Sequence, residues 1–282
     1  MSDDQPEPIP AAPDHAFRTL RTERQGPLCW LVLDRPGKGN ALNPQVLDEI
    51  DQVLSGLAAD RSVKVLIVRG DGRGFCSGHE LGRDRGPGDV MSVLERMNRT
   101  FATFERLWSF PRPVIAAVHG YCFGAATQLA ACCDLVAVSS DVRIGLPRLP
   151  MGAGLTPPML ALTVGVRRAK QLAFDVGSTI DGPTAVAWGW ANLCAAPEEL
   201  IGTVSSLAQR IARSPVAVLA GQKAALNRVA ALGGFWPTAT AGIEMDAMHY
   251  FAGTGAPTAR AIREVGIAGA VELFERGELG GT

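Results

Sequence analysis

The sequence predicts an α/β core followed by a helical C-terminal region. Short apolar runs rich in β-branched residues alternate with stretches of helical period, which is typical of α/β proteins. Glycine-rich turns repeatedly follow these runs, and from about Pro197 onward the chain is Ala-rich and amphipathic. With 282 residues, 47% of them hydrophobic, the chain can bury one sizeable core.

The first strand and helix are predicted between residues 28 and 57. The apolar run from Leu28 to Asp34 closes with Arg-Pro-Gly, which indicates a strand and then a turn. Asn43 occupies an N-cap position and Pro44 the first helical position. Apolar residues follow at helical spacing up to Leu57, so we expect a helix with one face on the core.

The same order of strand, glycine turn and helix recurs along the chain. A β-branched run ends in the glycine-rich stretch 70–74, and another leads into the small residues of 120–126. We therefore expect strands over residues 63–68, 113–118, 135–138 and 142–145, a helix over 88–108, and mostly helix from 155 onward. The predicted organisation is a disordered acidic, proline-rich lead (1–14), a core with the functional site (15–196) and a helical oligomerisation region (197–282).

Composition excludes several classes of partner. The net charge is -1 and no Lys/Arg cluster occurs, so we expect no nucleic-acid partner. The acidic start is unlike a signal or transit peptide, and no apolar run reaches the roughly 20 residues that a membrane span needs. The six cysteines lack Cys-x-x-Cys spacing, which favours buried free thiols in a reducing cytoplasm over disulfides or a metal site.

Other common catalytic motifs are incomplete. The third glycine of a dinucleotide-binding motif that starts at residue 70 would fall on Phe75. The His-Glu pair at 79–80 is followed by Arg83 where a zinc protease needs histidine, and no serine lies in Gly-x-Ser-x-Gly.

Two glycine-flanked loops remain, over residues 74–81 and 120–128. Each follows a predicted buried strand and precedes a predicted helix. Backbone N–H groups at such turns suit an oxygen that becomes negative during a reaction, and two facing loops would make an oxyanion hole. Alternatively, the glycines only permit tight turns.

In their order, several sequence blocks resemble the crotonase (enoyl-CoA hydratase/isomerase) superfamily over roughly two thirds of the chain. The blocks are residues 34–36, 40–43, 75–81, 113–120, 124–126, 133–135, 144–147 and 150–152. The resemblance implies a crotonase-like spiral of ββα repeats with a helical C-terminal trimerisation region, assembled as a homotrimer or hexamer. It also implies an acyl-CoA thioester substrate, an acyl-CoA lyase or isomerase activity in fatty acid metabolism, and no cofactor beyond the coenzyme A of the substrate.

The resemblance assigns roles to individual residues. The two backbone N–H donors of the oxyanion hole correspond to His79 and Ala125. The substrate-binding positions that it implies are Lys38, Ala41, Leu42, Ser77, Gly78, Leu81, Tyr121 and Gly124. Glu80 stands where the family usually has aspartate, and we expect it to brace its loop.

Both glutamates of the family's hydratases are replaced, by Gln128 and Arg148. Glutamine has no proton to exchange near neutral pH and arginine stays protonated, so neither can act as the base that activates water. We therefore expect a poor hydratase.

Several interpretations stay open. Arg148 is either a surface residue paired with an acid or a ligand for a substrate carboxylate. His79 is either a main-chain donor only or more, because similar histidines occur in family members that decarboxylate malonyl-type thioesters. The chain could thus be an enzyme that works through an enolate, a decarboxylase or hydrolase of an acidic acyl-CoA, or a non-catalytic acyl-CoA binder.

Overall fold

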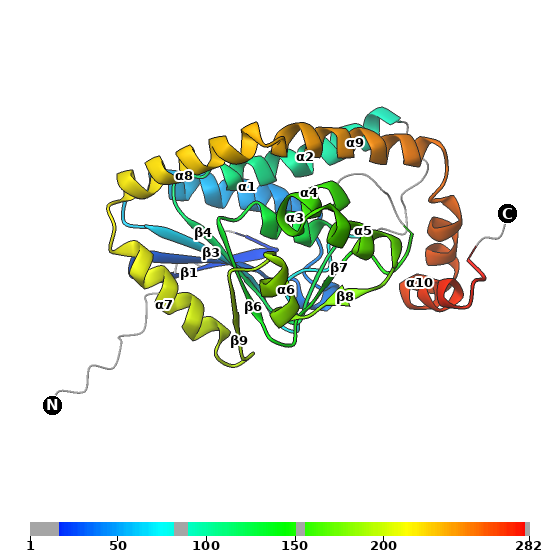
Figure 1. Ribbon diagram of the computed structural model, residues 1–282, viewed down its shortest axis with the longest axis horizontal. Coiled ribbons are helices and arrows are strands. Elements are labelled where there is room, and N and C mark those ends of the chain that lie inside the picture. The colour runs from blue at the N-terminus through cyan, green and yellow to red at the C-terminus, as the bar shows by residue number, and fades with distance from the viewer. Residues whose placement is uncertain (1–16, 82–89, 151–155, 280–282) are drawn as a thin grey trace.

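The computed structural model describes residues 17–81, 90–150 and 156–279, and within them the strands form two sheets (Figure 1). The larger sheet has the order β1-β2-β3-β4-β6-β9, with β1 antiparallel to β2 and the other neighbours parallel. Its strands are β1 (Leu20–Gln25), β2 (Leu28–Leu33), β3 (Val65–Gly70), β4 (Val114–Val118), β6 (Leu135–Ser139) and β9 (Leu193–Ala195). The smaller sheet has the order β5-β7-β8 and consists of β5 (Tyr121–Phe123), β7 (Arg143–Gly145) and β8 (Thr179–Ile180).

Helices follow most strands, which confirms the α/β class and the helical C-terminal region. Asn43 caps the first helix as predicted, because its side chain accepts a hydrogen bond of 2.9 Å from the Val46 N–H. The helices of the described residues are α1 (Pro44–Ala59), α2 (Val90–Trp108), α3 (Ala125–Ala131), α4 (Thr156–Val164), α5 (Val166–Phe174), α6 (Gly182–Trp188), α7 (Leu200–Ala212), α8 (Val216–Leu232), α9 (Phe235–Phe251) and α10 (Ala256–Glu275). None of them is both long and apolar enough to cross a membrane.

The parallel strands are buried on both faces, which explains why they read as continuous apolar runs. Leu31 and Val68 belong to the face that packs against α1, α2 and α3. Trp30 and Ile67, the alternate residues, belong to the opposite face, which α7 covers. The first helix of the C-terminal region therefore packs on the core.

A partly buried ion pair ties α8 to the core. The Lys223 ammonium lies 2.7 Å from the Asp134 carboxylate and donates to the Arg112 carbonyl at 3.1 Å. Burial raises the pKa of Asp134, while the Lys223 charge opposes that rise. The Lys223 side chain is only 7% exposed, so this carboxylate supplies the opposite charge that a buried ammonium needs.

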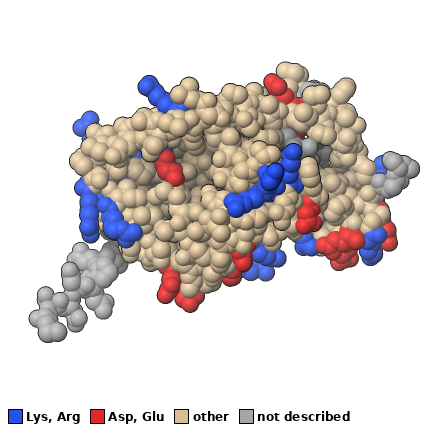
Figure 2. Space-filling view, viewed as in Figure 1, with Lys and Arg blue, Asp and Glu red and all other residues tan. Residues whose placement is uncertain are grey.

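The exposed apolar residues gather on the C-terminal helices. Across α8 and α9, at the top of the molecule in Figures 1 and 2, few charged side chains interrupt the surface. The exposed apolar residues of these two helices are Val218, Leu226, Val229, Leu232, Met245, Met248 and Phe251.

Four strands were not predicted from the sequence, and the burial of one cysteine was predicted wrongly. β1 has a polar sequence because it is an edge strand with partly solvated side chains, and β5, β8 and β9 span only two or three residues each. Cys194, predicted buried, is exposed because it lies on β9 at the other edge of the sheet, while all six cysteines are free thiols. The predicted disordered lead (1–14) and the predicted helix start at residue 88 fall outside the described residues.

Glu49 of α1 holds the segment before β1 to the core. Its carboxylate accepts hydrogen bonds from the backbone N–H groups of Arg18 (3.0 Å) and Thr19 (2.9 Å) and from the Thr19 hydroxyl. Burial alone would raise the pKa of Glu49, but these hydrogen bonds outweigh it and lower the pKa.

This arrangement predicts an acid-sensitive contribution to stability. A depressed folded-state pKa stabilises the fold above the unfolded pKa of about 4.3, and the effect is lost as pH falls through the folded pKa. Glu49→Gln should therefore lower the free energy of unfolding by about 1–3 kcal/mol at pH 7, with the deficit shrinking below about pH 4. Urea denaturation of both proteins from pH 8 to pH 3 measures it, and a deficit that does not change with pH would contradict this assignment.

Candidate functional site

The two glycine-flanked loops lie side by side, and the extended residues 76–80 of the first loop pair both with the loop before α1 and with the second loop. On one side, Leu42 pairs with His79: the Leu42 N–H donates to the Gly78 carbonyl, and the Glu80 N–H donates to the Leu42 carbonyl, both at 2.8 Å. On the other side, Cys76 pairs with Cys122 beside β5. The segment thus bridges the loop before α1 and the loop before α3.

Gly78, next to His79 in the first loop, lies against Phe123 and Ala125 of the second loop, and we call this region between the loops the seam. Because the neighbouring polar groups of Gly78 and Glu80 point to Leu42, the His79 N–H points to the other side of the segment. Ala125 is the first residue of α3, where an N–H has no acceptor within the helix. A Cβ added to Gly78 would lie 3.3 Å from the Ala125 nitrogen and 2.7 Å from the Phe123 carbonyl oxygen. Only glycine allows this approach, and its φ of +93° also favours glycine.

The predicted substrate-binding residues lie in the loop before α1, in residues 77–81 and in the loop before α3. Lys38 and Ser77 are exposed, whereas Ala41, Leu42, Gly78 and Gly124 are buried. The Ser77 N–H donates to the Gly39 carbonyl at 3.0 Å, which joins the first glycine-flanked loop to the loop before α1 at these two residues. Leu81 packs instead into an apolar cluster with Leu149 and residues of α10.

Tyr121 and Cys76, two titratable residues beside the seam, are held in their neutral forms. Burial raises the pKa of Tyr121 and raises the pKa of the Cys76 thiol to about 12. A buried, protonated thiol is a poor nucleophile, so Cys76 serves as a packing residue.

Arg35 and Asn40 hold this seam together, and our sequence analysis assigned them no role. The Arg35 guanidinium donates to the Ala41 carbonyl at 2.7 Å and pairs with the Glu80 carboxylate at 3.0 Å, which confirms that Glu80 braces its loop. Asn40 is 1% exposed and is the one described residue other than glycine with positive φ, +54°. Asparagine tolerates the left-handed conformation better than most residues, so an asparagine shortly after the Asp-Arg-Pro turn is the sequence signal that could have pointed to this loop.

A family model described as Enoyl-CoA hydratase/isomerase matches residues 23–248 of the chain. The chain belongs to this family. A short-chain-enoyl-CoA hydratase of Clostridium acetobutylicum is 33% identical over 73% of this chain and 80% of the relative. A 2,3-dehydroadipyl-CoA hydratase of Escherichia coli is 31% identical over 73% of this chain and 80% of the relative.

Solved structures of the enoyl-CoA hydratase/isomerase family share the fold. An enoyl-CoA hydratase/isomerase from Xanthobacter autotrophicus superposes with a TM-score of 0.88 and 28% identity, covering 93% of this chain and 98% of that one. An enoyl-CoA hydratase from Mycobacterium smegmatis gives 0.84 and 27%, covering 93% and 96%. The expected crotonase-like fold is thus confirmed.

Gln128 and Arg148, which the resemblance matched to the family's glutamates, lie in different surroundings. Gln128 lies one turn into α3 from Ala125 and is 3% exposed. Arg148 has a side chain that is 53% exposed and lies 2.7 Å from Glu275 of α10. This is the surface pairing considered in the sequence analysis, and it disfavours a role for Arg148 in holding a substrate carboxylate.

A cavity of about 390 Å³ lies beside His79, between the start of α1 and the first turns of α2. Leu42, Pro44 and Leu47 give it an apolar side, and α2 contributes polar and charged residues. The α2 residues that line it are Ser92, Glu95, Arg96, Arg99 and Thr100. Arg99 is already paired with Asp48 and with Asp51 of α1.

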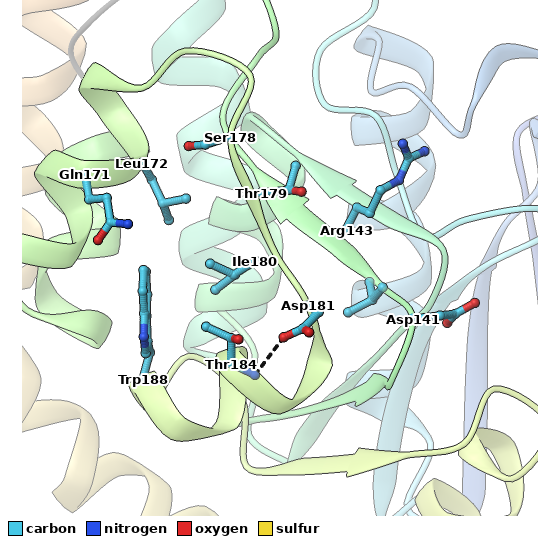
Figure 3. Close-up of a pocket in the computed structure, with 11 residues that line it drawn as sticks. Asp141, Arg143, Gln171, Leu172, Ser178, Thr179, Ile180, Asp181, Thr184 and Trp188 are labelled. Atoms are coloured by element: carbon cyan, nitrogen blue, oxygen red, sulfur yellow. Dashed lines mark hydrogen bonds between the residues drawn. The ribbon is translucent and has the colours of Figure 1, made fainter.

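A second cavity of about 390 Å³ contains none of the predicted site residues (Figure 3). It lies between the antiparallel strands β7 and β8 and helices α5 and α6, with Leu172 and Trp188 on one side and Ile180 on the other. In the described part of the chain, His, Cys, Asp and Glu side chains nowhere gather in threes that could hold a metal ion.

Proposed function

We propose that the protein binds an acyl-CoA thioester and stabilises the enolate form of its acyl group with the N–H groups of His79 and Ala125. The close approach of Gly78 to the Ala125 nitrogen supports this proposal, because Gly78 immediately precedes His79 and Ala125 opens α3. Preorganised donors of this kind stabilise a developing oxyanion by about 3 kcal/mol each.

Coenzyme A is proposed to lie along the outer edge of the same seam. Lys38 and Ser77 are exposed there, and a lysine suits the phosphates of coenzyme A. The relatives are named for reactions of CoA thioesters, which supports the same ligand class. In this proposal the substrate's coenzyme A is the only cofactor, and no metal takes part.

The proposed chemistry is an enolate reaction other than efficient hydration. Gln128 and Arg148 supply no carboxylate, so the chain lacks the pair that would move protons to and from water. Isomerisation, or another reaction through a stabilised enolate, fits the remaining groups. A catalytically inactive acyl-CoA binder would share the groove, and product analysis separates the two.

Decarboxylation of an acidic acyl-CoA is the second candidate, favoured by the position of His79. This residue lines the cavity that Arg96 also lines. Loss of CO₂ would leave the bonding electrons on the α-carbon as an enolate, which a proton from solvent then quenches. Incubation with malonyl-CoA and methylmalonyl-CoA, followed by mass spectrometry of the thioester products, tests it.

The binding proposal predicts a ligand-induced increase in stability. Acetoacetyl-CoA, whose enolate suits two N–H donors, should raise the melting temperature, with about 2.7 kcal/mol of stabilisation at a hundredfold excess over the dissociation constant. Free coenzyme A should give a smaller shift, because it lacks the carbonyl. No shift with either ligand at millimolar concentration, with folded protein present, would contradict the proposal.

We also propose that the protein assembles as a homotrimer or hexamer through its C-terminal helices. The exposed apolar side chains on α8 and α9 form a surface that favours burial against another chain (Figure 2). Light scattering at micromolar concentration should give a mass three or six times that of the 29.7 kDa chain. Replacing Leu226 and Val229 with lysine should lower it, whereas a monomeric wild type would contradict the proposal.

A further inference from the structure

We propose that Arg35 and Glu80 are positioning residues that aim the His79 N–H at the bound thioester and so set how strongly the site favours an enolate. This inference rests on the function proposed above. It goes further by assigning the orientation of one donor to a specific ion pair.

The contacts of Arg35 reach both backbone segments of the seam. Its Nη1 donates to the Ala41 carbonyl, and its Nη2 pairs with Glu80. Ala41 immediately precedes Leu42, and Glu80 immediately follows His79, while Leu42 and His79 are the paired residues. One planar guanidinium therefore holds each segment at the residue next to the pair.

The ion pair is sheltered enough to fix geometry. The Arg35 and Glu80 side chains are 16% and 29% exposed, so solvent screens this pair less than the surface pairs of the chain. A guanidinium also presents its N–H groups in a rigid fork, which gives two bonds in fixed directions. A lysine at this position could not bind the Ala41 carbonyl and the Glu80 carboxylate in the same two directions.

Asn40 keeps Arg35 itself in place. The Asn40 side-chain oxygen accepts from the Arg35 N–H at 2.9 Å. Its amide group donates to the carbonyls of Asp71 (2.8 Å) and Gly74 (2.9 Å), just after β3. The loop that carries Arg35 is thus anchored to the end of a central strand, and the guanidinium acts from a fixed base.

Positioning and simple structural support predict different results. The Leu42–His79 pairing already has two backbone hydrogen bonds, so loss of the ion pair should let the segments twist without unfolding them. A donor that moves by about 1 Å loses much of its effect on a reacting oxygen. The proposed coenzyme A contacts at Lys38 and Ser77 lie at the outer edge of the seam, away from the Leu42–His79 pair, and should sense the change much less.

The test uses Glu80→Gln, which keeps the side-chain shape and removes the charge, and Arg35→Lys, which keeps the charge and removes the fork. Each variant of the full-length protein is titrated with acetoacetyl-CoA, and the ultraviolet absorbance of the enolate, formed when the C2 proton passes to solvent, reports the bound enolate. Free coenzyme A is titrated in parallel. The control is Glu23→Gln, which removes an exposed carboxylate that pairs with Arg21 and Arg69.

We expect both variants to bind the enolate about tenfold more weakly than wild type while binding free coenzyme A within about twofold. The loss of enolate affinity in the double variant should be smaller than the sum of the two single losses, because both changes weaken the same Arg35–Glu80 pair. If affinities for the two ligands fall in parallel, or if the variants retain the wild-type enolate signal, the positioning role is overturned. If the wild-type protein forms no bound enolate, the proposed enolate-stabilising function is wrong, whatever the role of Arg35 and Glu80. If Arg35→Lys does not fold, the result for Glu80→Gln decides the positioning role.

Discussion

Purified protein is expected to hydrate crotonyl-CoA at least about 10²-fold more slowly than a family hydratase with both glutamates. Hydration requires one group to take a proton from water and another to deliver one to the α-carbon. A buried glutamine and an exposed, ion-paired arginine stand at the two expected positions. The two backbone donors alone would leave only residual catalysis.

Loss of the ultraviolet absorbance of the conjugated thioester measures this rate, with a glutamate-containing hydratase assayed in parallel. Turnover of hundreds per second would show that another acid has replaced the missing pair. The double variant Gln128→Glu, Arg148→Glu restores two carboxylates and so tests whether their absence limits hydration. We expect a small gain at most, because residue 148 points to α10 and would place its new carboxylate beside Glu275.

Gly78→Ala is expected to weaken enolate binding by about 10²–10³-fold, the loss that follows removal of one oxyanion donor. The added methyl group would lie 2.7 Å from the Phe123 carbonyl oxygen and 3.3 Å from the Ala125 nitrogen, so the two loops must separate. The enolate absorbance of bound acetoacetyl-CoA, measured against the affinity for free coenzyme A, reports the effect.

Gly177→Ala is the matched control for this substitution. Gly177 has φ of +92°, nearly that of Gly78, but an added Cβ would meet no atom within 4 Å. Both variants therefore carry the same backbone strain, and only Gly78→Ala opens the seam. Equal enolate binding by Gly78→Ala and wild type would show that the two loops do not act together on the ligand.

The positions of the main strands and helices could be predicted because they depend on local signals. β2, β3 and β4 are continuous apolar runs, and α1 begins with a side-chain cap and a proline that act within one turn. β1 carried no such signal because it is polar and its place is fixed by pairing with β2. Likewise, the edge position of β9 decides the exposure of Cys194.

The sequence by itself determined the family and the two loops that form the candidate site, since each loop is a contiguous block of residues. Only the tertiary structure decided which groups meet. Arg35 and Glu80 are 45 positions apart in the printed sequence, and their contact exists only because Leu42 pairs with His79. Arg148 was ambiguous until α10 supplied Glu275, 127 positions away. The orientation of a long side chain depends on such distant partners, which no local pattern encodes.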